Sequence, residues 1–179
     1  MQQILKLDSQ FTSFLTSLFP HNQFFNLFFS FFSLRGSSIL IWIIIIAILV
    51  IFEEKRDRKF IIYFLITFLT TSFLVNIVFK NIFQRPRPVF VKTSAGKPTS
   101  KISNCPTDYS FPSGHATTAF AAATTLTFFD KKRRWFYYLI ASTIAYSRIY
   151  LYCHYFGDVI IGAIIGYLIS RLFLHVKNI

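Results

Sequence analysis

The sequence predicts an all-α fold, a polytopic integral membrane protein whose helices form a bundle. Two long apolar runs are the main observation: residues 60–79 form a run of 20 without a charge, and residues 36–52 a run of 17. A helix needs about 20 such residues to cross a bilayer. The composition agrees, because 54% of the 179 residues are hydrophobic and 20% are aromatic. A soluble domain of this size needs more polar surface than that to cover its core.

Five firm spans are expected, and several runs spread along the whole chain exclude a signal peptide as their explanation. They lie at residues 37–52, 60–83, 112–129, 135–151 and 155–174. The third is rich in Ala and Thr after His115, and the fifth carries Gly162 and Gly166 four residues apart. Small residues let membrane helices approach closely, so we expect both spans to pack tightly within the bundle.

Residues 1–34 allow two interpretations. Residues 11–19 and 24–34 are apolar but too short to span alone, and the polar residues Pro20, His21, Asn22 and Gln23 separate them. They form either interfacial helices or one imperfect sixth span. Polar side chains at the middle of a membrane are costly, which favours the interfacial arrangement. We expect residues 1–179 to form one domain, with residues 37–176 as the helical core that carries the site.

The net charge of +12 helps to orient the chain. Nucleic-acid binding would require a polar fold with a basic face, so no nucleic-acid partner is expected. The basic residues instead cluster between apolar runs, at residues 55–59 and 131–134, as in cytoplasmic loops. The long polar loop at residues 84–111 and the turn at 152–155 then lie outside. We expect a protein of the plasma (inner) membrane whose site faces the outer, periplasmic side; the oligomeric state is not predicted.

Polar residues at the outer ends of four spans suit phosphate chemistry. The cations Lys80, Arg87 and Arg148 can neutralise a phosphate and the charge on its equatorial oxygens. Ser113 and Gly114 begin a predicted helix, where free backbone N–H groups and the helix dipole favour an anion. These five residues are the predicted phosphate-binding set.

Two histidines complete the predicted site. His154 and Asp158 are four residues apart and would share one face of a helix. A carboxylate on one imidazole nitrogen fixes the tautomer and leaves the other nitrogen free to attack. His115 is then left to protonate the leaving oxygen and to activate water.

Each element also has a structural explanation. A cation at the end of a span commonly extends to the interface, a His–Asp pair at this spacing is often structural, and Pro-Ser-Gly commonly starts a helix. The histidines and Asp158 could instead bind zinc, but three cations at the same place would repel a metal ion. We therefore expect no metal and favour the catalytic interpretation, because all the elements fall on one face.

Three motifs in this order resemble those of the type 2 phosphatidic acid phosphatases (PAP2), which share their site with the vanadium haloperoxidases. They are Lys-x6-Arg-Pro at Lys80–Pro88, Pro-Ser-Gly-His at Pro112–His115, and Ser-Arg-x5-His-x3-Asp at Ser147–Asp158. The resemblance covers residues 60–174. It implies a phosphohistidine at His154, acid–base catalysis by His115, orientation of His154 by Asp158, phosphate binding by the other five residues, and no cofactor. The haloperoxidases are soluble, so the spans favour the phosphatase branch.

The resemblance implies hydrolysis of a lipid phosphate or diphosphate in the membrane. Undecaprenyl diphosphate is the first choice of substrate, because small bacterial members with an outward-facing site are often phosphatases of this kind. Phosphatidylglycerophosphate, phosphatidic acid and lipid A phosphates are alternatives, and the fold alone does not select among them. A non-catalytic phospholipid-binding membrane protein is the alternative from another class. Such a protein would be expected to lack a nucleophile or an acid, whereas both histidines are present.

The two cysteines, Cys105 and Cys153, are not spaced as a CxxC pair, which excludes a zinc ribbon or a thioredoxin-like site. Both fall on the predicted outer face, where a disulfide can persist. A bridge would tie the long loop to His154. Disulfide geometry is strict, so two free thiols are the favoured interpretation.

Overall fold

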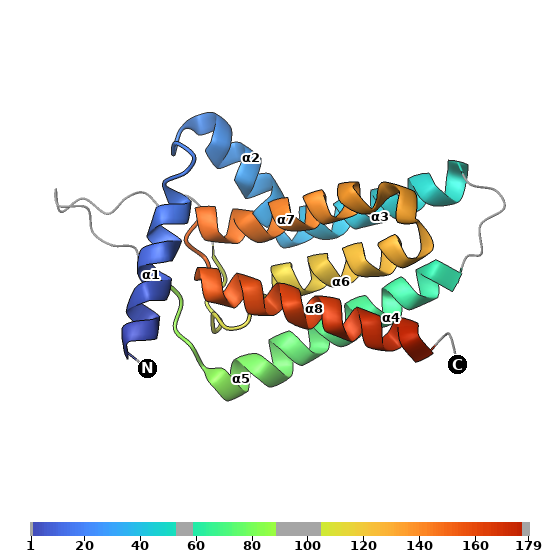
Figure 1. Ribbon diagram of the computed structural model, residues 1–179. Coiled ribbons are helices and arrows are strands. Elements are labelled where there is room, and N and C mark those ends of the chain that lie inside the picture. The colour runs from blue at the N-terminus through green and yellow to red at the C-terminus, as the bar shows by residue number, and fades with distance from the viewer. Residues whose placement is uncertain (1, 53–58, 89–104, 177–179) are drawn as a thin grey trace.

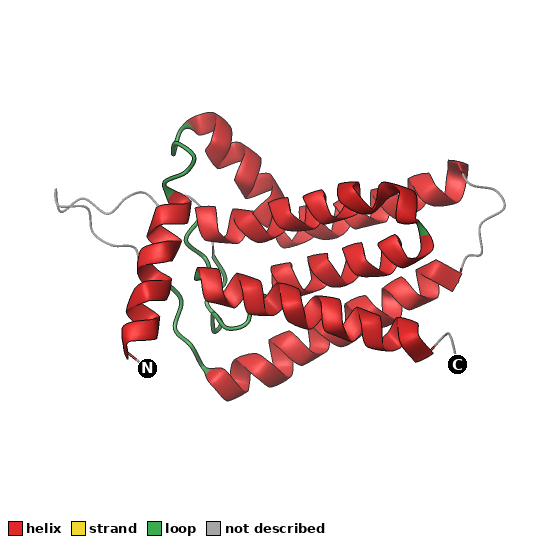
Figure 2. Cartoon of the chain, in the orientation of Figure 1, coloured by secondary structure: helices red, strands yellow, loops and turns green. Residues whose placement is uncertain are grey.

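The computed structural model describes residues 2–52, 59–88 and 105–176, and the regular structure in these ranges is entirely helical (Figures 1 and 2). The N-terminal helices are α1 (Gln2–Thr16), α2 (Gln23–Ser33) and α3 (Arg35–Phe52). A continuous helical stretch follows, made of α4 (Lys59–Phe73), the π-helical η1 (Leu74–Phe79) and α5 (Lys80–Phe83). The remaining elements are α6 (Gly114–Phe129), the short 3-10 helix η2 (Lys131–Arg133), α7 (Arg134–Tyr150) and α8 (Phe156–Val176).

The helices lie where the apolar runs predict them, but the predicted number of spans is not confirmed. Two helices in the described ranges are long and apolar enough to cross a membrane, Lys59–Phe83 with 25 residues and Phe156–His175 with 20. A third span results if α2 and α3, which meet at a bend of 70°, count as one broken span. With 16 and 17 residues, α6 and α7 are shorter than the roughly 20 residues a span needs.

The small-residue helix α6 lies at the centre of the bundle, against α4, α7 and α8 (Figure 1). A Cβ atom at Gly162 would lie 2.7 Å from the carbonyl oxygen of Ser113, and one at Gly166 would lie 2.1 Å from that of Thr117. The backbone of α8 therefore approaches α6 too closely for any side chain at these positions. This confirms the prediction that both helices pack tightly.

Large side chains fill the bundle between α3, α4, α6 and α7, and they include Trp42, Phe60, Leu126, Tyr137 and Ile144. Apolar side chains also cover the outside: Leu69, Leu139 and Leu172, for example, are 64–66% exposed. Extensive exposed apolar surface is rare on soluble monomers. An apolar exterior of this kind fits integration into a membrane.

Helix α1 lies across one end of the bundle rather than along it (Figure 1). Its last turns are fixed to α7: Tyr146 donates to the carbonyl of Leu15 at 2.7 Å, and Thr16 donates to that of Ile149 at 3.2 Å. Asn22 caps the start of α2 by accepting from the N–H of Phe25 at 3.0 Å. The two N-terminal apolar segments are thus separate helices, as the interfacial interpretation requires, although α2 is also one half of the candidate broken span.

Candidate active site

A cavity of about 360 Å³ lies between the stretch from α4 to α5, the start of α6 and the end of α7. Its lining contains six of the eight predicted site residues, Lys80, Arg87, Gly114, His115, Arg148 and His154. The other two, Ser113 and Asp158, are fully buried directly behind this lining. The structure therefore brings together residues from α5, α6, α7, α8 and the loop between α5 and α6, as the sequence predicts.

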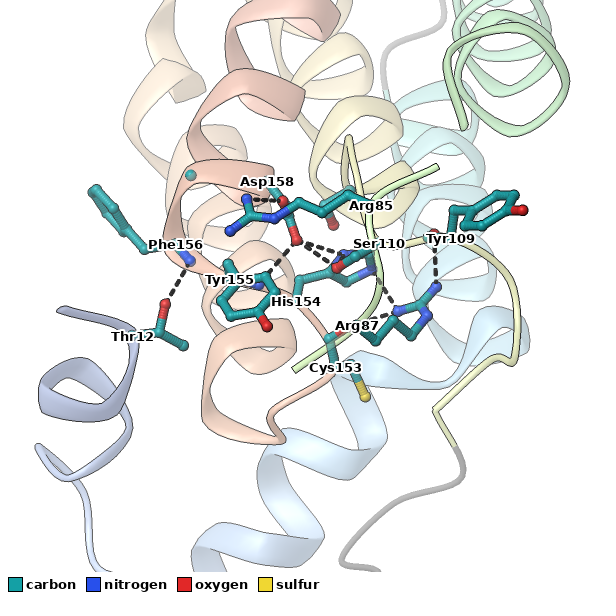
Figure 3. A network of polar contacts seen from close by, with 12 residues as sticks. Thr12, Arg85, Arg87, Tyr109, Ser110, Cys153, His154, Tyr155, Phe156 and Asp158 are labelled. Atoms are coloured by element: carbon teal, nitrogen blue, oxygen red, sulfur yellow. Dashed lines mark hydrogen bonds and ion pairs between the residues drawn. The ribbon is translucent and has the colours of Figure 1, made fainter. Parts of the chain in front are cut away.

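His154 lies in the turn between α7 and α8 and is only 1% exposed. The chain reverses at Tyr152, whose φ is 54°, and the backbone N–H of His154 donates to the carbonyl of Arg148 at 3.1 Å. The ring nitrogen Nε2 faces Nη1 of Arg87 at 3.1 Å (Figure 3). A guanidinium group can only donate, so Nε2 accepts and carries its lone pair.

The other ring nitrogen of His154, Nδ1, is linked to Asp158 by a third residue. Nδ1 of His154 lies 3.6 Å from Oδ2 of Asp158, within ion-pair range but too far for a hydrogen bond. The hydroxyl of Ser110 lies 3.3 Å from Nδ1 and donates to the same Oδ2 at 2.5 Å (Figure 3). The predicted shared helix face is not present, because α8 begins only at Phe156. Ser110, which lies outside the three motifs and was not predicted, links the two predicted residues.

The first two cations converge on one carboxylate. Lys80 is the first residue after the π-helical segment, and its Nζ lies 2.5 Å from Oδ2 of Asp108. Nη2 of Arg87 lies 2.6 Å from Oδ1 of the same residue, and Nη1 of Arg87 donates to the carbonyl of Cys153 at 2.6 Å. Partial burial raises the pKa of Asp108, but the hydrogen bonds and charges of Lys80 and Arg87 outweigh it and lower this pKa to about 2. Asp108 therefore places a negative charge at the cavity wall.

The third cation, Arg148, lies in the last turn of α7 and is 2% exposed. Its Nη1 donates to the carbonyl oxygen of Ser33 at 2.9 Å and to the hydroxyl of the same serine. The end of α2 therefore positions an arginine that also lines the cavity.

The N-terminus of α6 closes one side of the cavity. Ser113 precedes α6 as its N-cap residue, and its backbone N–H donates to the carbonyl of Asp158 at 3.0 Å. Gly114 and His115 line the cavity. The first N–H groups of an α-helix have no partner within the helix, and together with the helix dipole they favour an anion beside Gly114.

Comparison with known proteins places this arrangement in a family. The profile of the PAP2 superfamily matches residues 60–178. The chain belongs to the PAP2 superfamily. Over 140 residues it is 35% identical to an undecaprenyl-diphosphatase of Sulfolobus acidocaldarius, which covers 77% of this chain and 64% of the relative. The chain thus spans slightly less than two thirds of the length of this curated relative.

Two solved structures resemble this PAP2 chain. Aquifex aeolicus LpxE is 25% identical, with a TM-score of 0.67 and 93% of both chains covered. A PAP2 type phosphatidylglycerolphosphate phosphatase from Bacillus subtilis has a TM-score of 0.72, covering 99% of this chain and 88% of the other. At 21% identity, the second likeness shows the fold alone.

Several residues that build this PAP2 site were not predicted from the sequence. Arg85, Asp108 and Ser110 lie in or near the motifs, and their proximity to Arg87 and Pro112 is the only signal that could have selected them. Asp8 and Ser33 lie outside the matched residues 60–178 and contact Arg85 and Arg148, respectively. No sequence pattern links residues separated by 77 and 115 positions.

The two cysteines form a disulfide, with 5.4 Å between their Cα atoms. The expectation of two free thiols is therefore wrong, because the fold brings residues 48 positions apart to a separation that a disulfide can bridge. The bond ties the segment before α6 to the residue that precedes His154. Among the described residues, no group of three His, Cys, Asp or Glu side chains is arranged to hold a metal ion; independence of metals and cofactors stays a prediction.

Proposed function

We propose that this PAP2 protein hydrolyses the phosphate or diphosphate group of a membrane lipid, with His154 as the nucleophile. The observation that carries the proposal is the orientation of one imidazole: Nε2 accepts from Arg87 in a cavity that also presents Lys80 and Arg148. Burial, followed by the positive charges of Arg148, Arg87 and Lys80, lowers the pKa of His154 well below its ordinary value. The neutral, nucleophilic form is thus favoured beside cations that attract a phosphate.

The first chemical step follows from these positions. Nε2 of His154 attacks the terminal phosphorus, and the bond from that phosphorus to the leaving oxygen breaks. The leaving oxygen is the alcohol oxygen of a lipid phosphate or the bridging oxygen of a lipid diphosphate, and His115 donates a proton to it. The positive charge that develops on the imidazole is stabilised by the carboxylate of Asp158 through the hydroxyl of Ser110. Lys80, Arg87, Arg148 and the N–H groups in the first turn of α6, which begins at Gly114 after Ser113, hold the equatorial oxygens, where charge accumulates in the transition state.

The second step regenerates the protein. His115, now neutral, takes a proton from a water molecule, whose oxygen attacks phosphorus and breaks the bond from phosphorus to nitrogen. The products are inorganic phosphate and neutral His154. No metal ion is needed in either step.

We propose undecaprenyl diphosphate as the first substrate to test, which the 35% identity to the curated undecaprenyl-diphosphatase supports. Phosphatidylglycerophosphate, phosphatidic acid and lipid A phosphates are the alternatives. The apolar exterior of the bundle supports a substrate held in the bilayer, and the family supports a lipid phosphate.

The proposed location is the plasma (inner) membrane with the site on the periplasmic side. The Cys105–Cys153 bond supports it, because disulfides persist outside the reducing cytoplasm. Thiol alkylation of denatured protein, quenched directly from cells, tests it. Labelling only after reduction agrees with the proposal, whereas labelling without reduction contradicts it.

The function itself is tested by phosphate release in detergent across a panel of lipid phosphates and diphosphates. We expect turnover of at least one lipid, inhibition by vanadate, and loss of activity by at least about a thousandfold in His154→Ala. His175→Ala, which removes an exposed histidine from the last turn of α8, is the matched control and should stay active. Full turnover in His154→Ala would contradict the mechanism, and phosphate binding without turnover in the unmodified protein would indicate the non-catalytic alternative.

A further inference from the structure

Helix α1 supplies side chains that cap the helix carrying Asp158. The backbone N–H of Phe156 donates to the hydroxyl of Thr12, and that of Gly157 donates to Oδ1 of Asp8, both at 2.9 Å. These N–H groups lie in the first turn of α8, where they have no partner within the helix. Capping groups usually come from the residue just before a helix, whereas here they come from residues more than 140 positions away.

The same Asp8 also holds the arginine that binds Asp158. Nη2 of Arg85 lies 2.7 Å from Oδ2 of Asp8, and Nη1 of Arg85 lies 2.6 Å from Oδ1 of Asp158 (Figure 3 shows the second contact). One guanidinium group therefore joins two carboxylates. The three side chains are 16%, 13% and 0% exposed, so salt screens these pairs less than it would on an open surface.

The Arg85 guanidinium is fixed from three sides. Besides its two carboxylate partners, it lies over the ring of Tyr155, with its central carbon 4.0 Å from the ring centroid. With one carboxylate partner the guanidinium group could still rotate about that contact. Two carboxylates on different nitrogens fix the orientation of the guanidinium plane. The orientation of Oδ1 of Asp158 is then fixed as well.

Position 157 leaves room for this arrangement. A Cβ atom at Gly157 would lie 2.9 Å from Oδ2 of Asp8, closer than a normal contact. Any other residue would push the Asp8 carboxylate away from Arg85. The absence of a side chain at Gly157 thus lets α1 approach the start of α8 beside the Arg85–Asp158 pair.

We propose that Asp8 is a positioning residue for catalysis. Through Arg85 it fixes Asp158, and Asp158, through Ser110, fixes the imidazole of His154. This inference rests on the proposed role of His154 as nucleophile. Asp8 is absent from the lining of the cavity, so it should affect the chemical step rather than substrate binding. It also lies outside the family-matched residues 60–178, so the N-terminal helix would be part of the catalytic apparatus of this chain.

The test measures kcat and KM of the full chain in detergent for Asp8→Asn. We expect kcat to fall at least about fivefold, since misplacement of a reacting group by about 1 Å can cost up to about a hundredfold, with KM within about twofold of the unmodified protein. Asp8→Glu keeps the carboxylate and should recover part of the lost kcat. Unchanged kcat in Asp8→Asn would overturn the proposal.

Asp130→Asn is the matched control. Asp130 is a buried carboxylate that accepts hydrogen bonds from Arg133 at 2.8 Å and Tyr137 at 2.6 Å, at the end of α6 away from the cavity. Its replacement also removes an arginine–aspartate pair, so it should lower the melting temperature without lowering kcat. An equal loss of kcat in Asp130→Asn and Asp8→Asn would mean a general structural effect and would overturn the proposal.

A double-mutant comparison separates positioning through Asp158 from any independent role. In an Asp158→Asn background, Asp8→Asn should lower kcat by less than about twofold further, because residues that act through one another are non-additive. Fully additive losses would overturn the proposal. An active His154→Ala protein would instead refute the proposed function, whereas an inactive His154→Ala beside a fully active Asp8→Asn would refute only the role of Asp8.

Discussion

The hydroxyl of Ser110 donates to Oδ2 of Asp158 at 2.5 Å, and the same hydroxyl oxygen lies 3.3 Å from Nδ1 of His154. Ser110 is fully buried. Because its only hydrogen is directed at the carboxylate, its oxygen can accept from the Nδ1–H of a neutral imidazole. Ser110 thereby selects the tautomer whose Nε2 lone pair faces the cavity.

Replacing Ser110 by Ala should therefore lower kcat by about 10- to 100-fold, because both the tautomer and the position of the imidazole lose their constraint. Steady-state kinetics in detergent measure the effect. Ser170→Ala is the matched control, since Ser170 is also fully buried and its hydroxyl donates to the carbonyl of Ala121 at 3.0 Å, in a pair that does not line the cavity. Equal kcat values for the two variants would argue against a role of Ser110 in catalysis.

Asp108 pairs with two of the cations that are predicted to bind phosphate, so we expect it to compete with the substrate for them. Its carboxylate contacts Lys80 and Arg87 in the cavity wall, where the phosphate of a substrate would bind. Asp108→Asn removes this competing charge and should lower the inhibition constant for vanadate about tenfold, which corresponds to about 1.4 kcal/mol. Asp108→Glu retains the charge and should stay close to the unmodified protein. Weaker vanadate inhibition in Asp108→Asn would show that Asp108 positions the cations rather than competing for them.

The protonation of His154 gives a prediction that does not depend on turnover. Its pKa is lowered, first by burial and then by the nearby cations, so the ring should remain neutral as the pH falls below the ordinary value of about 6.5. NMR titration of labelled histidines, with His154→Ala to assign the signal, measures this. Lys80→Gln removes a positive charge and should raise the pKa of His154. A signal that titrates near 6.5 in the unmodified protein would contradict the prediction.

The same shift predicts a pH dependence of stability. The unfolded chain binds a proton on this histidine at higher pH than the folded chain does. Stability should consequently be lost as the pH falls below about 6.5, the unfolded value, towards the lower folded pKa. Melting temperatures measured across this range should fall less steeply in His154→Asn, which cannot be protonated. Identical slopes would show that His154 does not control the acid sensitivity.

The close contact between α6 and α8 predicts a large difference between two glycine substitutions. A Cβ atom at Gly166 would lie 2.1 Å from the carbonyl oxygen of Thr117, whereas one at Gly36 would have no atom within 4 Å. Gly166→Ala should destabilise the protein by about 3 kcal/mol, and Gly36→Ala should be neutral or slightly stabilising. Melting temperatures in detergent compare the two. Equal melting temperatures for the two variants would contradict the close contact between α8 and α6.

The sequence predicts the main helices and most of the site because both leave local signals. Apolar runs mark α3, the stretch from α4 to α5, and α8, and spacing within three motifs identifies the residues that line the cavity. The contacts of Asp8, Ser33 and Cys105 depend instead on the tertiary fold, which brings them close to residues far away in the sequence. A carboxylate in an N-terminal helix gives no local indication that it will face Arg85. Helical spacing predicted that His154 and Asp158 face each other, and Nδ1 and Oδ2 do lie 3.6 Å apart. They do not share a helix face, because His154 precedes the first turn of α8.

In the proposed mechanism, phosphate passes through a covalent bond to His154. The most direct measurement is rapid quenching of the protein with a radiolabelled lipid phosphate, followed by denaturation and peptide mapping. We predict an acid-labile, base-stable label on the peptide that contains His154, and no such label in His154→Ala. In His115→Ala the label should accumulate with a substrate whose leaving group needs no proton, because water is then no longer activated to remove the phosphate. Turnover of the lipid with no label on that peptide, or with the label on another residue, would contradict the claim.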